Sequence, residues 1–421
     1  MVYIGGLIVI LTAIAIIKKI EVRLVLFTSG MLMALLAGNI LEGVDAFTNS
    51  MIHGSLVPII CTVMGFAYVL KLTRCDDHLV HLISEPMTKF RRILIPGAVI
   101  VTAFINISLT SAAGASAAVG AILIPALIAA GVHPATAAAA IFAGTFGSSL
   151  SPGNAQNVLV ADIAGVDVME VIGVLAPAVI SAIIIGAISL TVTAFIRKED
   201  SGYVAEDGVD EPTEKEIFKV NFLKALVPVF PLILLIATSS AVGLFETAIT
   251  VPQAMLLGTG VAVLVSMKNP QEISKAFFDG MGNAYANIIG IIIAASVFTA
   301  GMSAIGLTNA LIEVMENSEA IVGIAATFGP FILAVLSGSG DAATIAFNNA
   351  ITPNAALFGL ETINLGSIAA LAGALGRTMS PVAGAGIVCA SIAKVSPVEL
   401  AKRNAPGMII AAIVAMLMMV M

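Results

Sequence analysis

Two charged residues, Arg377 and Asp341, lie in long runs of small and apolar residues, where a charge is costly unless it binds something. Arg377 lies within Gly-Arg-Thr-Met-Ser-Pro, and its planar guanidinium can hold a carboxylate through two parallel hydrogen bonds. Asp341 follows Gly-Ser-Gly, and its carboxylate can ligate Na⁺, carry a coupling proton, meet a substrate ammonium or neutralise Arg377. The sequence therefore predicts an anion site at Arg377, with pairing to Asp341 or to helix carbonyls as the structural alternative.

Hydroxyl and amide side chains gather in four segments where Gly and Pro interrupt apolar runs, namely 108–116, 149–157, 337–344 and 377–384. Backbone that leaves a helix at membrane depth survives only where it is buried in protein or lines a cavity. Its freed amides suit a carboxylate and its freed carbonyls suit a small cation. The predicted substrate-binding residues are Ser111, Asn154, Asn157, Ser337, Ser339, Arg377, Thr378 and Ser380. The predicted ligands of a coupling Na⁺ are Ser111, Gly114, Gly338, Gly340 and Asp341.

Other chemistries lack the residues that they need. The four histidines (His53, His78, His81 and His133) fall in loops or interfacial segments without ligand spacing, so we expect no metal site beyond Na⁺ and no bound cofactor. An intramembrane hydrolase needs a nucleophile with a base, and the apolar runs contain no Lys or His, so we expect no enzymatic activity. Nucleic-acid binding is not expected either, because no basic patch is interleaved with aromatic residues.

The composition is that of a polytopic, all-α membrane protein. Of the 421 residues 59% are hydrophobic and 11% charged, against about a quarter charged in soluble domains, and the mean hydropathy is +1.07. Apolar runs of about 17–25 residues are long enough to cross a bilayer as helices. The amino-terminal run lacks the features of a cleaved signal peptide and is expected to be retained. The cysteines form no motif and are expected to be free thiols.

The apolar runs predict five crossings and one re-entrant hairpin in each half of the chain. The hairpins are placed at 93–131 and 319–357, and the crossings near 3–17, 24–41, 54–73, 135–165, 169–196, 224–243, 251–267, 285–303, 366–394 and 397–420. Stretches 74–92 and 304–318 are predicted to be interfacial amphipathic arms. Every Lys and Arg except Arg377 then falls on one side, which the positive-inside rule makes cytoplasmic. This predicts a multi-pass protein of the inner or plasma membrane with both termini outside the cytoplasm.

The chain contains an internal repeat. Residues 143–152 (AGTFGSSLSP) match residues 372–381 (AGALGRTMSP), 229 positions later, with twelve identities over the 35 positions from 143 to 177. An odd number of crossings per half turns the second half over, which predicts an inverted-topology repeat. The predicted units are a first repeat (1–196), a cytoplasmic linker (197–223) and a second repeat (224–421). The spans form two further predicted groups, 1–73 with 224–303 and 93–196 with 319–421, and the second group contains both hairpins and both broken helices.

Three phrases resemble the DcuC-type anaerobic C4-dicarboxylate carriers, within the ion-transporter superfamily that includes the divalent-anion sodium symporters. They are GMGNAYANIIGIIIAASVFTAGMSAIG (280–306), LSGSGDAATIAF (336–347) and LGRTMSPVAG (375–384), the last running into AKVSPVELAKR (393–403). The resemblance implies a homodimer in the lipid bilayer and substrates such as succinate, fumarate or malate. It further implies an elevator-like movement of a transport part (93–196 and 319–421) against a scaffold (1–73 and 224–303). It also implies site roles for Gly338, Ser339, Gly340, Arg377, Thr378, Ser380 and Pro381. Asp341 departs from the expected pattern, in which this position is uncharged.

These features predict a secondary active transporter of small organic dianions, above all C4-dicarboxylates, coupled to Na⁺ or H⁺ or working by exchange through an elevator mechanism. Two alternatives stay open. A carrier for amino acids or monocarboxylates would use Asp341 for an ammonium or a proton. A passive anion channel would use the same half-helix ends without saturation or counterflow.

Overall fold

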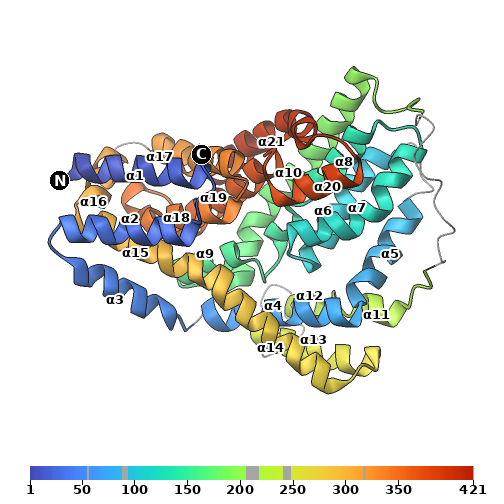
Figure 1. The fold of residues 1–421 in the computed structure, drawn as a ribbon, viewed down its shortest axis with the longest axis horizontal. Coiled ribbons are helices and arrows are strands. Elements are labelled where there is room, and N and C mark those ends of the chain that lie inside the picture. The colour runs from blue at the N-terminus through green and yellow to red at the C-terminus, as the bar shows by residue number, and fades with distance from the viewer. Residues whose placement is uncertain (55, 88–92, 205–217, 240–247, 316–318, 421) are drawn as a thin grey trace.

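The structure, a computed structural model, describes residues 1–54, 56–87, 93–204, 218–239, 248–315 and 319–420. Over these residues the chain is helical, with no strand among them (Figure 1). The first half contains α1 (Val2–Ile17), α2 (Val22–Leu36), α3 (Ile40–Met51), α4 (Leu56–Thr73), α5 (Cys75–Met87), α6 (Leu94–Ser108), α7 (Ala112–Ala129), α8 (Pro134–Ala143), the short 3-10 helix η2 (Gly147–Leu150), α9 (Ala155–Ala164) and α10 (Val168–Arg197).

The described second half is likewise a series of short and long helices. It contains α11 (Phe222–Leu226), α12 (Phe230–Thr238), α13 (Val251–Ser266), α14 (Pro270–Ala284), the π-helical turn η3 (Tyr285–Ile289), α15 (Gly290–Ala304), α16 (Leu307–Met315), α17 (Glu319–Ser337), α18 (Gly340–Ala350), the 3-10 helix η4 (Thr352–Phe358), α19 (Thr362–Thr378), α20 (Gly384–Ile392) and α21 (Pro397–Met419).

Five helices of the described chain are long and apolar enough to cross a membrane. They are α4, α7, α10, the continuous helix from Pro270 to Ala304, and α21. Further apolar helices, among them α1, α2, α6 and α13, are shorter. The fold is therefore consistent with a multi-pass membrane protein, as the composition predicts.

The predicted interruptions coincide with helix ends. The first hairpin tip separates α6 from α7, and the second separates α17 from α18. The first Ser-Pro segment, named the first break, separates η2 from α9, and the second, named the second break, separates α19 from α20. Two predicted boundaries are wrong. The span placed at 285–303 begins at Pro270, because Asn269 accepts a hydrogen bond from the Gln271 amide at 3.0 Å and starts the helix there. The span placed at 24–41 ends at Leu36, and α3 follows as a separate helix.

The helices pack in two groups. In the first, the long α14–α15 helix packs along α4 with one end and along α2 with the other, and it crosses the front of the molecule in Figure 1. In the second, α10 packs along α21, α17 along α19, and α7 along α20. The groups meet where α15 contacts α18 and α4 contacts α9. The helix ends that carry Asp341 and Arg377 belong to the second group.

Glycine permits two close helix approaches. A Cβ atom on Gly301 of α15 would lie 2.2 Å from the carbonyl oxygen of Gly30 on α2. A Cβ atom on Gly376 of α19 would lie 2.2 Å from the carbonyl oxygen of Phe331 on α17. Both distances are too short for any side chain, so the backbones meet only because these residues have none. Gly376 thus sets the packing distance beside Arg377.

Arg403 of α21, one of the arginines predicted on the cytoplasmic side, lies in an ion cluster where its side chain is 3% exposed. Its Nε and Nη2 donate to the two carboxylate oxygens of Glu199 at 2.8 and 2.6 Å, and its Nη1 donates to Glu399 Oε2 at 2.8 Å. Thr136 of α8 also donates to Glu199. Burial alone would raise the pKa of Glu199, but the hydrogen bonds from Arg403 and Thr136 and the charge of Arg403 outweigh it, so the pKa is lowered. The cluster joins the ends of α8, α10 and α21.

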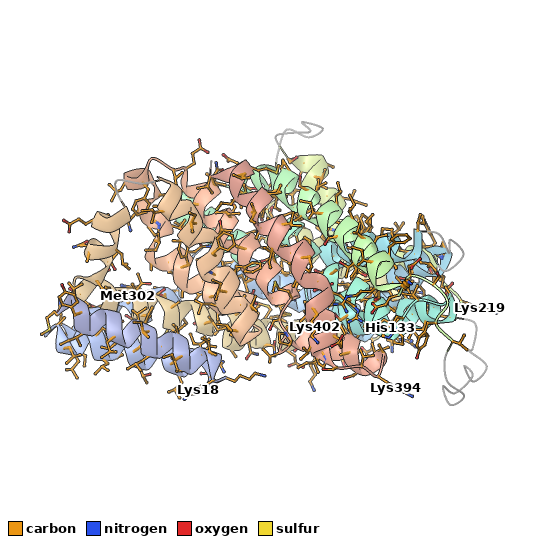
Figure 2. All side chains as sticks on the ribbon, turned by 90° about the horizontal axis from the view of Figure 1, so that it is seen from above. Lys18, His133, Lys219, Met302, Lys394 and Lys402 are labelled. Atoms are coloured by element: carbon orange, nitrogen blue, oxygen red, sulfur yellow. The ribbon has the colours of Figure 1, made fainter. Side chains whose placement is uncertain are left out.

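The structure describes only some of the Lys and Arg residues that are predicted to lie on the cytoplasmic side. Figure 2 shows Lys18 and Lys394 along one edge of the molecule and Lys219 at its far end. Lys89, Arg91, Arg92 and Lys215 lie outside the described residues, as do positions 205–217 of the predicted linker. The sidedness of the charges stays a prediction.

Replacing Gly376 with Ala should lower the thermal stability of the detergent-purified protein by about 1–3 kcal/mol, because the new methyl group forces α17 and α19 apart. Gly329→Ala on α17 is the control. A Cβ there meets no described atom within 4 Å, so helix propensity should keep this variant neutral or stabilise it by up to about 1 kcal/mol. Equal melting temperatures for both variants would contradict the close approach.

Replacing Glu199 with Gln should destabilise the protein by about 1–3 kcal/mol at neutral pH, because Arg403 loses a charged acceptor. The pKa of Glu199 is lowered in the fold, so its stabilisation is present above the ordinary carboxyl pKa and is lost as the pH falls through the folded value. The melting temperatures of wild type and variant should therefore converge on acidification. The exposed Glu361→Gln control should show no such gap at either pH.

Candidate functional site

A polar cavity lies where four helix ends meet. η2 ends at Leu150 and α9 begins at Ala155, while α18 begins at Gly340 and α19 ends at Thr378. The cavity is lined by Ser148, Ser149, Asn154, Gln156, Asn157, Gly340, Asp341, Thr344, Ala370, Ala374 and Arg377. Its volume of about 30 Å³ is enough for about two water molecules. A larger ligand therefore requires the lining to open.

Arg377 provides the positive charge of this cavity. It lies on the last turn of α19, where a cation interacts favourably with the negative end of the helix dipole. Its Nη2 donates to the carbonyl oxygen of Thr145 at 2.9 Å, whereas its Nη1 is buried and has no hydrogen-bond partner among the described residues. A buried donor without a partner costs about 1–3 kcal/mol, and more when it is charged. The guanidinium is thus held by one carbonyl and has an N–H group available for an anion.

Asp341 provides the negative charge of the cavity lining. It lies on the first turn of α18, where a negative charge interacts favourably with the positive end of the helix dipole. Asp341 is exposed, whereas most of the lining residues are buried. The Asp341 carboxylate interacts electrostatically with the Arg377 guanidinium. Within the described parts of the chain, however, the two residues do not form a salt bridge. The cavity therefore has a positive pole at Arg377 and a separate negative pole at Asp341. The structural alternative for Arg377 was pairing with Asp341 or with helix carbonyls, and of these only a carbonyl contact is present, with Thr145.

Gln156 of α9 lines the cavity beside Asp341 and is not among the predicted site residues. Its Nε2 donates to Asp341 Oδ1 at 3.2 Å and lies 3.4 Å from the Asp341 carbonyl oxygen. Its Oε1 is buried and has no partner in the described chain. This contact joins positions 185 residues apart, so no local pattern could have selected Gln156.

Ser148 is a second lining residue outside the predicted set. It lies 229 positions before Arg377, at the same register of the internal repeat, and both residues line this one cavity. Its neighbour Ser149 also lines the cavity, and both serines are buried. The repeat register was the signal that could have found Ser148.

Two of the predicted residues, Asn154 and Asn157, line the cavity and also satisfy the broken backbone. Asn154 Nδ2 donates to the Ser148 carbonyl oxygen at 3.0 Å. Asn157 Nδ2 donates to the carbonyl oxygens of Ser149 and Ser151 at 2.8 and 3.0 Å. Because these Nδ2 groups already donate to backbone carbonyl oxygens, their main role is to hold the cavity wall in place and not to donate to a ligand.

Asn106 of α6 braces the same break from outside the cavity. Its Oδ1 accepts a hydrogen bond from the Ser148 amide at 2.8 Å, and its Nδ2 donates to the Leu109 carbonyl oxygen at 2.8 Å. The side chain is buried, and it connects the first hairpin tip to the first broken helix. Asn106 was not predicted, because it lies within an apolar helix before the polar tip.

The remaining residues predicted at the second tip lie beside the described cavity lining. Ser337 donates to the Leu333 carbonyl oxygen at 2.7 Å, and Ser339 caps α18. Gly338 has a φ of +78°, and a Cβ on it would lie 2.8 Å from the Val382 carbonyl oxygen. Together with Gly340 and Asp341, which do line the cavity, they form a tight turn against the second break.

The predicted residues of the second break serve the backbone in the same way. Thr378 donates to the Ala374 carbonyl oxygen at 2.8 Å, and Ser380 donates to the Val335 carbonyl oxygen at 2.7 Å. Asn404 of α21 donates to the Thr378 carbonyl oxygen at 3.2 Å. Ligand contact by Thr378 and Ser380 stays a prediction.

The first hairpin tip faces a different space. Ser111 caps α7 by accepting from the Gly114 amide at 3.1 Å, and neither residue is part of the described cavity lining. Ser108 and Thr110 of this tip line a separate, mainly apolar crevice with Ser151 and Pro152, against α4, α12 and α13. The two tips thus lie on different sides of the first break. A role for Ser111 and Gly114 in cation binding stays a prediction.

Across the described residues, no three His, Cys, Asp or Glu side chains converge as metal ligands. The described lining of the cavity offers the positive charge of Arg377, the negative charge of Asp341, and hydroxyl and amide groups. The sequence matches the DcuC family, described as the C4-dicarboxylate anaerobic carrier, over residues 6–421. The chain belongs to the DcuC family. This is a family of transporters and not of enzymes.

Similar proteins place this DcuC-family chain among transporters. A Haemophilus influenzae protein, named only as an uncharacterized transporter, is 45% identical over 271 residues, which cover 62% of this chain and 96% of that protein. The Escherichia coli K12 protein named anaerobic C4-dicarboxylate transporter DcuC is 26% identical over 376 residues, which cover 86% of this chain and 79% of that protein.

Two solved structures share the fold of the DcuC-family chain. MtrF of Neisseria gonorrhoeae, described with a class of antimetabolite efflux pumps, has a TM-score of 0.61 at 14% identity and covers 91% of this chain and 83% of its own. The YdaH transporter of Alcanivorax borkumensis has a TM-score of 0.56 at 15% identity and covers 90% of this chain and 86% of its own. Identities this low establish a shared fold and not a shared substrate.

Replacing Asn106 with Ala should destabilise the protein by about 1–3 kcal/mol, because the buried Ser148 amide loses its acceptor. Ser148→Ala is the matched control, since it removes the hydroxyl but keeps the amide bonded to Asn106, and it should cost less than about 0.5 kcal/mol. Thermal unfolding in detergent measures both. Equal losses in the two variants would show that Asn106 does not brace the break.

Proposed function

We propose that this protein is a secondary active transporter of small organic dianions, above all C4-dicarboxylates such as succinate, fumarate and malate. The observation that carries the proposal is the guanidinium of Arg377, whose buried Nη1 is left free by the described residues beside a cavity between broken helices. A carboxylate suits this donor both as an ion pair and as a hydrogen-bond acceptor. The name of the Escherichia coli relative supports the substrate class.

In this proposal the rest of the diacid meets hydroxyl groups and helix ends. Ser148 and Ser149 line the cavity beside Arg377, and α9 and α18 both begin at its wall. Hydroxyls and the positive ends of helices interact favourably with a second carboxylate. Asn154 and Asn157 hold this wall in position through their carbonyl contacts.

The proposal includes two inverted repeats. Several helices of the second half begin 229 positions after their counterparts in the first, namely α2 and α13 at Val22 and Val251, α9 and α20 at Ala155 and Gly384, and α10 and α21 at Val168 and Pro397. This spacing supports a duplicated unit. An odd number of crossings in each unit inverts the second, so that broken helices from opposite sides meet near the midplane.

An elevator-like movement then provides alternating access. The transport part (93–196 and 319–421) moves as a body against the scaffold (1–73 and 224–303), and the separate packing of these two groups supports the division. The driving force is Na⁺ coupling, proton coupling or exchange. A coupling Na⁺ binds near Gly338, Gly340 and Asp341 and near Ser111 and Gly114. The protein works as a homodimer in the inner or plasma membrane, with both termini outside the cytoplasm.

Uptake of labelled succinate into proteoliposomes loaded with unlabelled succinate tests the function. The wild type should show saturable counterflow. Arg377→Lys should weaken the apparent succinate affinity at least about tenfold, because an ammonium cannot form two parallel hydrogen bonds to a carboxylate. Arg197→Lys, at the exposed end of α10, is the matched control and should behave as the wild type.

The outcomes separate the proposed function from its alternatives. Flux without saturation or counterflow would indicate a passive anion channel. Failure of succinate, fumarate and malate to compete with any transported solute would contradict a dicarboxylate carrier. An unchanged succinate affinity in Arg377→Lys would assign the arginine a structural role at the Thr145 carbonyl.

A further inference from the structure

We propose that the cavity favours diacids that carry an ammonium group on the carbon next to one carboxylate, that is, 2-amino dicarboxylates, over unsubstituted dicarboxylates. This inference rests on the proposed function and narrows its substrate class. It depends on the second pole of the cavity, formed by Asp341 and Gln156, which an unsubstituted dianion does not use.

The cavity contains both an unused donor and an unused acceptor. Arg377 Nη1 and Gln156 Oε1 are buried, and neither has a partner in the described ranges. Buried polar atoms in proteins are nearly always bonded, so such atoms on a cavity wall indicate the groups that a ligand brings. The donor calls for a carboxylate oxygen. The acceptor calls for an N–H or O–H group, which succinate and fumarate lack when ionised.

The orientation of the Gln156 amide follows from its contacts. Its nitrogen faces Asp341 Oδ1 and the Asp341 carbonyl oxygen, and both of these atoms accept hydrogen bonds. Turning the amide over would place its oxygen against two other oxygens, which is repulsive. Gln156 Oε1 is therefore the end that remains free, and Asp341 orients it.

The charges of the wall favour an ammonium over a hydroxyl at this acceptor pole. Among the described lining residues, only Arg377 and Asp341 are charged, and their charges cancel. An unsubstituted dianion adds two negative charges to this neutral wall and places one of them near Asp341. A 2-amino dicarboxylate adds one net negative charge, with its ammonium available to Asp341 and Gln156. Uncompensated charge in a protein interior is costly, so the amino diacid fits better.

The second carboxylate distinguishes an amino diacid from a simple amino acid. The hydroxyls of Ser148 and Ser149 lie on the same wall as Arg377 and are available to this group. An amino monocarboxylate would satisfy the two poles but leave these hydroxyls without a ligand acceptor. The wall therefore has complementary groups for two carboxylates and one ammonium.

Competition against labelled succinate in wild-type proteoliposomes tests this inference. The competitors are unlabelled succinate, 2-hydroxysuccinate, 2-aminosuccinate and alanine, each assayed with Na⁺ and with choline in its place. We expect 2-aminosuccinate to compete at about a tenfold lower concentration than succinate, 2-hydroxysuccinate to fall between them, and alanine to compete least.

Two variants connect the preference to the acceptor pole. In Asp341→Asn the wall gains a net positive charge, so succinate should compete better and the advantage of 2-aminosuccinate should fall to about twofold or less. Asp45→Asn, on the exposed face of α3, is the control and should retain the wild-type preference.

Each contrary outcome has a distinct meaning. Equal competition by succinate and 2-aminosuccinate, or a preference that survives in Asp341→Asn, overturns this inference but leaves the dicarboxylate transporter intact. Alanine competing as well as 2-aminosuccinate overturns the requirement for two carboxylates. Succinate uptake that depends on Na⁺, with no advantage for 2-aminosuccinate, assigns the acceptor pole to a cation and overturns the inference. If no diacid is transported, the proposed function itself fails.

Discussion

Backbone groups released where helices break inside a membrane protein must find partners within the protein, and the candidate site follows from that constraint. At the first break the partners are amides, with Asn154 and Asn157 donating to the freed carbonyls. At the second break Ser380 donates to the neighbouring helix α17 and Asn404 donates to Thr378. Helix ends can stop beside one another only because these side chains accompany them. The cavity is the space that the ends leave between them.

The freed backbone groups find partners at both breaks, but the two breaks differ in charge. The first uses neutral residues, with Ser148 where the second has Arg377, and these two register-equivalent residues share one cavity. Asp341 enters from the second hairpin, whereas the first tip faces a different, mainly apolar crevice. The two sequence-related segments therefore carry different side chains. In the proposed transporter, binding specificity arises from that difference, since helix ends alone provide only partial charges.

Local signals in the sequence were enough to predict the interruptions but not every helix or contact. Gly and Pro mark the tips and breaks directly, so α6, α7, α19 and α20 end close to their predicted places. The charged residues Glu272, Lys275 and Asp279 hide the first turns of the long helix from a hydropathy criterion, and α14 was missed. Arg377 and Asp341 were found because isolated charges are conspicuous in apolar runs. Gln156 was not, because its partner at 341 is distant in the chain and ordinary polar residues surround it.

A comparison of the two shielded arginines separates a structural charge from one that is available to a ligand. Two carboxylates, those of Glu199 and Glu399, bind all three guanidinium nitrogens of Arg403 and compensate its charge. Arg377 has one carbonyl contact, no salt bridge to a carboxylate among the described residues, and a buried N–H group without a partner there. Both side chains carry a cost of desolvation, and only the charge of Arg403 meets carboxylates within the described chain. In the proposed transporter, an anion that binds reversibly supplies the partner that Arg377 lacks within the described chain.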